Sequence, residues 1–386
     1  MCLDTVPSNV FNDVSKQWVS CPSSFQTTAL KRKRHTDRSF DITFHCQDTS
    51  NTTCHKAKQA FERVGDMISQ MILFKQPIKV NATLASFCKL DNQRCDEKMI
   101  TLGGSCPSRS IPLLNKDGVF RLHPQALVKQ FELEERPLFA PFDIISVFNV
   151  DAPFWFEHEF MHGLGFYSGW NQYLSNQDSI TPDPSPFLTN QWIQTLSPGS
   201  NAIHPAPFIE SALDRLIHIL PLNMSLSDLT HQMNAIGGDM TSPAFKSITD
   251  RFKKIATTPF TMGIKIGDNV LLILETGLSP FKSGSSISHV AFQKYNEHPE
   301  FLMRYKQDRG RTLADVQGSG HHAMGPSLLS VFEALGYATK QHPEAIPPLF
   351  IVTREWSPSF VHAGRANMLS PVVPFALLLL WCGLIF

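Results

Sequence analysis

Two histidines at helical spacing constrain this sequence more than any other feature. His158 and His162 lie four residues apart in the run 157–162, so an α-helix would place both imidazoles on one face, one turn apart. Asp151–Pro153 predicts the start of that helix, because aspartate caps free amide groups and proline suits the first turn. The carboxylate of Glu159 then lies directly beside the two imidazoles.

The order His-Glu-x-x-His is the arrangement in which zinc peptidases hold their metal. Zinc lowers the pKa of a bound water towards about 7, and a neighbouring carboxylate takes its proton as the water attacks a peptide carbonyl. We therefore predict that His158 and His162 bind Zn²⁺ and that Glu159 is the general base. A surface helix with two solvated histidines is the alternative, but Trp155 and Phe160 predict a buried helix.

The third zinc ligand is not on this helix. Gly165 lies where the longer pattern H-E-x-x-H-x-x-G-x-x-H turns the chain away from the helix, and Ser168 stands in place of the last histidine. Up to Gly165 the sequence resembles the metzincin metalloproteases. A catalytic zinc usually has three protein ligands, so the third comes from elsewhere or the site is defective. The candidates are His204, His218, His231, His289, His298, His321, His322 and Glu210.

Within the metzincins, the chain distantly resembles the leishmanolysin branch. Members of that branch have a long insertion before the third histidine, then a methionine turn and a last helix ending near Leu-Gly-Tyr or Leu-Gly-Trp. Here His289 is followed by Met303, and a predicted helix ends at 335–337, Leu-Gly-Tyr. The resemblance implies that His289 is the third ligand and that Met303 lies beneath the zinc. The cysteine-rich C-terminal region of leishmanolysin is missing.

Other assignments of the third ligand stay open. His321 and His322 are the second choice, with Met324 as the methionine turn. Glu210 is the third, because its spacing to Asp214 is similar to that in the second helix of thermolysin-like enzymes. A loop histidine bonded to backbone, without metal, is the alternative role of His289.

Hydrophobic periodicity predicts a strand at 40–46, an amphipathic helix at 54–74 and a strand at 77–84. A strand, a helix and a strand at this spacing favour a crossover unit in a mostly parallel sheet. Further elements are expected as strands at 142–148 and 269–274, helices at 124–135 and 208–220, and a last helix that Gly336 terminates.

These elements predict an α+β fold. The resemblance implies a metzincin-like catalytic domain with a mixed twisted sheet, an active-site helix and a smaller C-terminal lobe, with zinc in the cleft between them. The expected segments are an N-terminal or propeptide-like segment 1–34, a catalytic domain 35–340, a linker 341–370 and a hydrophobic tail 371–386. Within the catalytic domain, the upper lobe covers about 35–166, and the insertion and lower lobe cover about 167–340.

The eight cysteines include no C-x-x-C pair, which favours disulfides over a zinc ribbon. Five of them lie between positions 46 and 106, so we expect Cys21 to complete a set of six with these five. The alternative is a zymogen thiolate of Cys21 on the zinc. Glycosylation sequons begin at Asn51, Asn81 and Asn223 and are typical of a secreted glycoprotein.

The uncharged apolar end at 371–386 is shorter than the roughly 20 residues of a transmembrane helix. The small residues Ala363, Gly364, Ala366 and Asn367 and a brief polar spacer precede it, which fits a GPI-attachment signal; a tail anchor and a buried strand are the alternatives. Such a signal acts only in the secretory pathway and no signal peptide follows Met1, so we expect an incomplete N-terminus. Lys31–Arg34 is then a dibasic processing site, with a nuclear-localisation signal or a solvated loop as alternatives.

The 34 basic and 34 acidic residues balance to a net charge of zero, which weighs against nucleic-acid binding. We therefore predict a secreted or cell-surface zinc endopeptidase that cleaves protein or peptide substrates and is attached to the membrane through its tail. The alternative is a non-catalytic surface or adhesion protein with the same fold that has lost turnover, because Ser168 replaces the expected ligand. The sequence indicates neither the oligomeric state nor the cleavage specificity.

Overall fold

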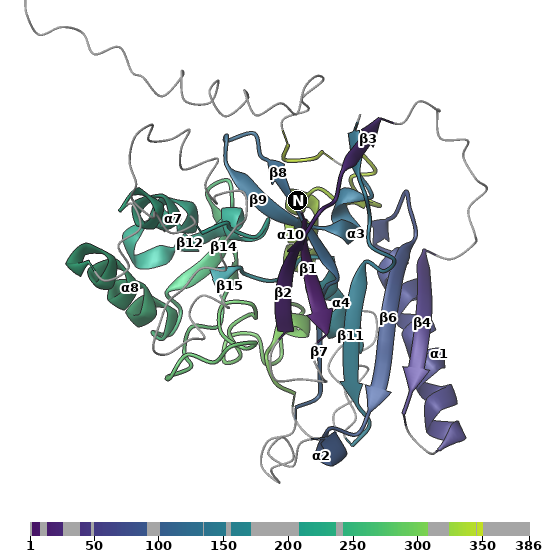
Figure 1. Ribbon diagram of the computed structural model, residues 1–386. Coiled ribbons are helices and arrows are strands. Elements are labelled where there is room, and N and C mark those ends of the chain that lie inside the picture. Colours follow the sequence, from purple (N-terminus) through teal and green to yellow (C-terminus); the bar gives the residue numbers. More distant parts are fainter. Residues whose placement is uncertain are drawn as a thin grey trace, which may run out of the picture.

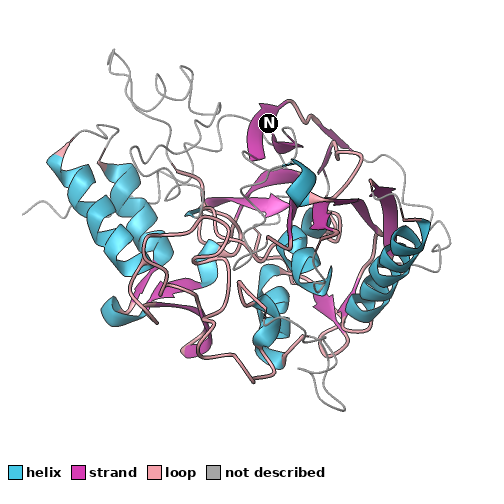
Figure 2. Ribbon diagram, turned by 90° about the horizontal axis from the view of Figure 1, so that it is seen from below, coloured by secondary structure: helices cyan, strands magenta, loops and turns pink. Residues whose placement is uncertain are grey.

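The computed structural model has two halves that meet at helix α4 (Phe156–Leu164), which carries the histidine motif (Figure 1). A mostly parallel sheet with helix α1 (Asn51–Ser69) forms one half. A smaller sheet with helices α7 (Leu226–Ala235) and α8 (Pro243–Ala256) forms the other (Figure 2). The predicted α+β class is confirmed. The structure describes residues 2–7, 14–25, 39–47, 50–90, 101–133, 135–151, 156–170, 208–236, 242–307, 324–344 and 346–349.

The larger sheet has four strands in the order β4-β6-β11-β7. They are β4 (Phe40–Cys46), β6 (Ile78–Ala85), β11 (Ile144–Asn149) and β7 (Gly103–Pro107). Strands β4, β6 and β11 are parallel, and β7 pairs with β11 in the antiparallel direction at the edge. Helix α1 connects β4 to β6, so the predicted crossover unit is confirmed.

Helix α1 begins three residues before the predicted helix 54–74 and ends five residues before its end. Ser50 explains the early start, because its Oγ accepts a hydrogen bond from the backbone N–H of Thr53. Beyond the helix the chain forms β5 (Ile72–Leu73), which pairs with β16 (Ala338–Thr339). This pairing ends the helical conformation and joins two segments that are far apart in the sequence.

Helix α4 lies against strands β7 and β11 and contacts α1. The ring of Phe160 is fully buried and stacks on Phe40 and Phe61, with centroid distances of 5.6 and 6.1 Å. The motif helix is therefore buried, as its aromatic residues predicted. Asp151, the predicted cap of this helix, accepts hydrogen bonds from Oγ of Ser86 and from the backbone N–H of Cys88. Residues 152–155, the rest of the predicted start, lie outside the described residues.

Gly163 allows α4 to approach β11 closely. A Cβ atom at this position would lie 2.4 Å from Cγ2 of Ile144 and 2.8 Å from its Cγ1 and Cδ1. We expect Gly163→Ala to lower the free energy of unfolding by about 1–3 kcal/mol through overpacking, although alanine favours helix. Chemical denaturation measures this change. Gly104→Ala on β7 is the matched control, because its Cβ would meet no atom within 4 Å. Equal stability of the two variants would contradict the prediction.

The smaller sheet is antiparallel, with the order β13-β12-β14-β15. Its strands are β13 (Met224–Ser225), β12 (Ile217–Ile219), β14 (Met262–Ile266) and β15 (Asn269–Ile273). Strand β15 confirms the strand predicted at 269–274. The helix predicted at 208–220 is wrong, because the backbone of β12 pairs with β14 and leaves only the 3₁₀ turns η3 (Asp214–Leu216) and η4 (Leu220–Leu222).

The helix predicted at 124–135 is wrong beyond its first turn. Helix α3 (Gln125–Val128) has only four residues. Helix α2 (Phe87–Leu90), which follows β6, is equally short. Just after α3, the side chain of Gln130 accepts hydrogen bonds from the backbone N–H groups of residues 75 and 76. This long-range contact holds the chain in a turn where the local pattern favoured a helix.

The N-terminal residues contribute strands to two further sheets, with the orders β2-β1-β8-β9 and β10-β3. These strands are β1 (Cys2–Pro7), β2 (Val14–Val19), β3 (Ser23–Phe25), β8 (Arg109–Leu114), β9 (Phe120–Pro124) and β10 (Glu135–Pro137). Asp4 also forms an ion pair of 2.5 Å with the largely buried Arg109. The described part of the predicted segment 1–34 is therefore packed on the rest of the fold. Residues 26–38, including the predicted processing site, lie outside the described ranges.

The predicted pairing of Cys21 with the downstream cysteines is wrong. Cys21 is bonded to Cys2, and Cys46 is bonded to Cys54. Cys2 and Cys21 lie at the open end of the β1–β2 hairpin, whose register pairs Cys2 with Val19. The hairpin therefore brings the two sulfurs together locally. A disulfide-bonded Cys21 also has no thiolate to offer to a metal.

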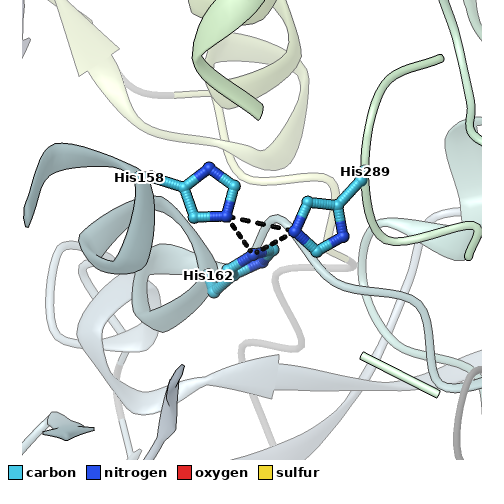
Figure 3. Close-up of side chains that lie close together, drawn as sticks. All are labelled: His158, His162 and His289. Carbon is cyan, nitrogen blue, oxygen red and sulfur yellow. Dashed lines mark hydrogen bonds between the residues drawn. The ribbon is translucent and has the colours of Figure 1, made fainter. Parts of the chain in front are cut away.

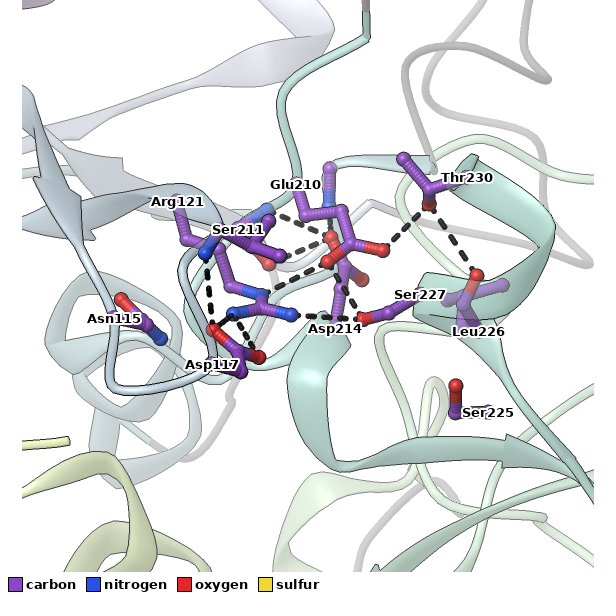
Figure 4. Close-up of polar contacts among 12 residues, drawn as sticks. Asn115, Asp117, Arg121, Glu210, Ser211, Asp214, Ser225, Leu226, Ser227 and Thr230 are labelled. Atoms are coloured by element: carbon purple, nitrogen blue, oxygen red, sulfur yellow. Dashed lines mark hydrogen bonds and ion pairs between the residues drawn. The ribbon is translucent and has the colours of Figure 1, made fainter. Parts of the chain in front are cut away.

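A buried ion pair joins β9 to the segment that precedes the smaller sheet. On β9, Nε of Arg121 donates to Oε2 of Glu210 at 2.9 Å, and both side chains are about 1% exposed. Arg121 also donates to Asp117 and to Ser227, and Glu210 accepts from Thr230 (Figure 4). These partners satisfy the buried charges, whose desolvation would otherwise destabilise the fold.

The last described helix is α10 (Pro326–Leu335). It ends at Gly336, whose φ of +115° is unfavourable for other residues, as predicted for this helix end. In the described part of the chain, no helix is long and apolar enough to cross a bilayer. The predicted tail at 371–386 lies outside that part.

Candidate metal centre

The C-terminal end of α4 is shaped by Gly165. This residue has a φ of +121°, and the backbone N–H groups of Gly165 and Phe166 donate back to the carbonyls of His162 and Met161. The chain therefore turns away from the helix at Gly165, as the motif predicted. On the far side, Oη of Tyr337 donates to the carbonyl of Leu164 at 2.8 Å, so the segment after α10 closes this end of α4.

Three histidine side chains converge beside α4. Nε2 of His158 lies 3.2 Å from Nε2 of His162, and Nε2 of His289 lies 3.1 and 3.2 Å from these two atoms (Figure 3). His158 and His162 come from α4, whereas His289 comes from the loop that follows β15 in the other half. The structure thus brings His158 and His162, which the motif predicted as ligands, together with His289, which the resemblance implied as the third.

The second nitrogen of each ring identifies its tautomer. Nδ1 lies 2.7 Å from the carbonyl oxygen of Leu302 in His158, 2.7 Å from that of Phe166 in His162, and 3.0 Å from that of Ser285 in His289. A carbonyl oxygen can only accept, so Nδ1 carries the hydrogen in all three rings. In the neutral rings every Nε2 then presents a lone pair, and the three lone pairs face one another without a donor between them.

The spacing of the three nitrogens fits a metal ion. Two nitrogen ligands about 2.0–2.1 Å from a tetrahedral ion lie about 3.3–3.4 Å apart, close to the observed 3.1–3.2 Å. Hydrogen bonding of Nδ1 to a carbonyl is also the usual way in which metal-binding histidines are oriented. His158, His162 and His289 could therefore hold a metal ion.

Burial keeps these imidazoles neutral. It lowers the pKa of His158 to about 4 and, together with the nearby His158, that of His162 to about 3. The pKa of His289 is likewise well below its usual value, because of burial and the two neighbouring imidazoles. Neutral imidazole is the form that binds metals, so the three rings are in the ligating state at neutral pH.

Glu159 follows His158 on α4 and is 7% exposed. Burial raises the pKa of its carboxyl group to about 8. Edge strand β7 runs close by, because a Cβ atom added at Gly103 would lie 3.4 Å from Oε1 of Glu159. The side chain of the predicted general base therefore lies between α4, which carries it, and the edge strand β7 of the larger sheet.

Met303 lies at the end of the 3₁₀ turn η5 (Phe301–Met303), which contacts α4. Its side chain is fully buried, and its carbonyl accepts a hydrogen bond from the N–H of Val290, next to His289. The preceding residue, Leu302, is the one whose carbonyl orients His158. The methionine turn beneath the zinc stays a prediction. Met324, the alternative, is also buried.

The other candidate ligands lie elsewhere or are not described. Glu210 is engaged by Arg121, as described above, and is not among the residues that converge with the histidine pair. His218 and His298 line a separate cavity beside the smaller sheet, and His231 is exposed on α7. The remaining candidates, His204, His321 and His322, lie outside the described residues.

One residue near the site was not expected. Cys106 on β7 keeps a free thiol, whose pKa burial raises to about 11 in spite of the opposing hydrogen bond to Thr5. The carboxylate of Glu159 is close enough to raise this pKa further. The odd number of cysteines between positions 46 and 106 was a signal of one unpaired thiol, but it did not identify which one.

A family model described as SPBPB7E8-like matches residues 13–373. A curated relative from Schizosaccharomyces pombe (strain 972 / ATCC 24843), named Uncharacterized protein PB7E8.01, is 27% identical over 390 residues. The match covers 85% of this chain and 66% of that relative, so the chain spans slightly less than two thirds of its length. No solved structure matches significantly. Since the family model covers most of the chain, this protein belongs to the SPBPB7E8-like family.

Proposed function

We propose that this protein is a zinc-dependent endopeptidase, with His158, His162 and His289 as the metal ligands and Glu159 as the general base. The observation that carries the proposal is the convergence of three Nε2 lone pairs within 3.2 Å of one another. Three acceptors without a donor repel one another, so the arrangement needs a cation to be favourable. Such buried, unsatisfied polar groups are typical of a metal site.

The ligand set favours zinc. Three histidines with a further open position are a known catalytic zinc arrangement, whereas calcium and magnesium prefer oxygen ligands. Imidazoles also bind copper, nickel and iron, so the three histidines alone do not single out zinc. The combination of these histidines with a neighbouring carboxylate base favours zinc. The Glu159 carboxylate follows a ligand directly in the sequence, which is the arrangement of zinc peptidases.

Glu159 would transfer protons during peptide hydrolysis. When bound, zinc polarises the substrate carbonyl and makes water more acidic. The Glu159 carboxylate takes a proton from the attacking water and then gives it to the leaving amine. Without a metal, burial raises the pKa of Glu159 to about 8, and a nearby divalent cation would lower this pKa and favour the carboxylate form.

The order of the elements supports a metzincin-like arrangement for this site. A glycine turn follows α4, the third histidine comes from a distant loop, and a buried methionine and a last helix come after it. The disulfides Cys2–Cys21 and Cys46–Cys54 favour an oxidising compartment. We therefore infer an extracellular or cell-surface location, with the GPI anchor as a further expectation.

Metal analysis combined with a cleavage assay tests the proposal on the full chain. We expect one zinc per chain by atomic emission, and cleavage of casein that is lost with 1,10-phenanthroline and restored by added zinc. A chain that binds zinc tightly but cleaves neither casein nor gelatin would favour the non-catalytic surface protein. A chain that takes up no metal would contradict both the ligand set and the enzyme.

A further inference from the structure

Ser168 occupies the position at which the longer zinc-peptidase pattern has its third histidine. In this chain the third Nε2 comes instead from His289, which lies 127 residues after His162. The two segments are nevertheless in direct contact, because the backbone N–H of Ser168 donates to Oγ of Ser288 at 3.1 Å. Ser288 immediately precedes His289, so this bond joins the segment after α4 to the loop that carries the distant histidine.

Asp214 holds Ser168 from the other side. Its Oδ1 accepts from Oγ of Ser168 at 2.5 Å, and its Oδ2 accepts from the backbone N–H groups of Gly169 and Ser211 at 3.0 and 2.8 Å. Ser168, Ser211 and Asp214 are all buried. The packing around Gly169 is tight, because an added Cβ would lie 3.2 Å from both Oδ2 of Asp214 and the N atom of Ser211.

The same segment orients a second histidine. The carbonyl of Phe166, two residues before Ser168, accepts the hydrogen bond from Nδ1 of His162. A displacement of residues 166–168 would therefore move the carbonyl of Phe166, which orients His162, and the N–H of Ser168, which bonds to the loop that carries His289. Metal ligands must be held within about 0.5 Å, and partners behind the ligands typically change metal affinity by about 10–100-fold.

We propose that Ser168, Asp214 and Ser288 are positioning residues that set the distance of His289 from His158 and His162. Asp214 fixes Ser168, and Ser168 fixes the loop through Ser288. The serine that replaces the expected histidine thus supports the histidine that supplies the third nitrogen. This inference rests on the metal site of the proposed function and does not require that the site be catalytic.

Serine variants of the full chain test the inference through metal binding. Ser168→Ala and Ser288→Ala are each expected to lower zinc affinity, measured by chelator competition, by about 10–100-fold. With Co²⁺ in place of zinc, both should weaken the visible absorption bands that report tetrahedral coordination. Ser288→Thr keeps the hydroxyl group and is expected to retain a zinc affinity within about threefold of the wild type.

Thr249→Val is the matched control. It removes a buried hydroxyl that bonds to the carbonyl of Lys246 within α8, so it reports what a lost buried hydrogen bond does to stability alone. We expect a small change in its thermal midpoint and no change in its zinc affinity or Co²⁺ spectrum. Wild-type affinity and spectra in both Ser168→Ala and Ser288→Ala would overturn the inference, as would failure of Ser288→Thr to restore binding.

The readouts separate this inference from the proposed function. If the wild-type chain binds zinc but cleaves no peptide, and Ser288→Ala lowers the zinc affinity, the positioning role stands and the peptidase function does not. If the chain cleaves peptide and both serine variants keep the wild-type zinc affinity, the peptidase function stands and the positioning role does not. If Ser288→Ala fails to fold, Ser168→Ala and Ser288→Thr decide the outcome. A wild-type chain without metal would overturn both.

Discussion

Replacing Glu159 by glutamine is expected to reduce kcat/KM for casein by about 10²–10⁴-fold, the usual contribution of a general base. Glutamine has nearly the same shape, so the packing of α4 against β7 should persist. It cannot accept a proton at neutral pH, which removes the proposed chemistry. The three imidazoles are unchanged, so zinc content should remain at one per chain.

Glu157→Gln is the matched control for this variant. Glu157 lies on the same helix, is similarly buried at 8% exposed, and points to a different face because it is two residues away. We expect its activity to remain within a few-fold of the wild type. Zinc-dependent cleavage that survives Glu159→Gln would exclude Glu159 as the base, even if the metal site is correct.

Replacing His289 by alanine is expected to remove most of the bound zinc. Two histidines on one helix turn remain, and a two-ligand site falls short of the three protein ligands that catalytic zinc usually has. After dialysis against a weak chelator, we expect the zinc content to fall from about one to below about 0.1 per chain. Casein cleavage should be lost in parallel, and metal analysis by atomic emission measures the first effect directly.

His298→Ala is the control for His289→Ala. His298 is an exposed histidine of the same long loop, and its Nδ1 accepts a hydrogen bond from the N–H of Glu300. We expect its zinc content to equal that of the wild type. Full zinc in His289→Ala would refute the ligand assignment and turn attention to His321 and His322, which were the second choice from sequence.

Local patterns predicted the elements whose residues interact within a few positions. The alternation in β4 and β6, the apolar stripe of α1 and the glycine after α10 all act over short spans, and the structure confirms them. The predictions failed where distant backbone competes with the local pattern. At 217–219 the chain pairs with β14, and at 130 a side chain bonds to residues 75 and 76.

The pair His158 and His162, with Glu159 beside them, could be predicted without a structure, because helical geometry converts a spacing of four residues into one face. It could not determine the third nitrogen, since several histidines were compatible with the motif and only a resemblance favoured His289. The tertiary structure brings His289 to the pair across 127 residues. No local period encodes this proximity, because it depends on contacts between residues that are far apart in the chain, such as the bond from Ser168 to Ser288.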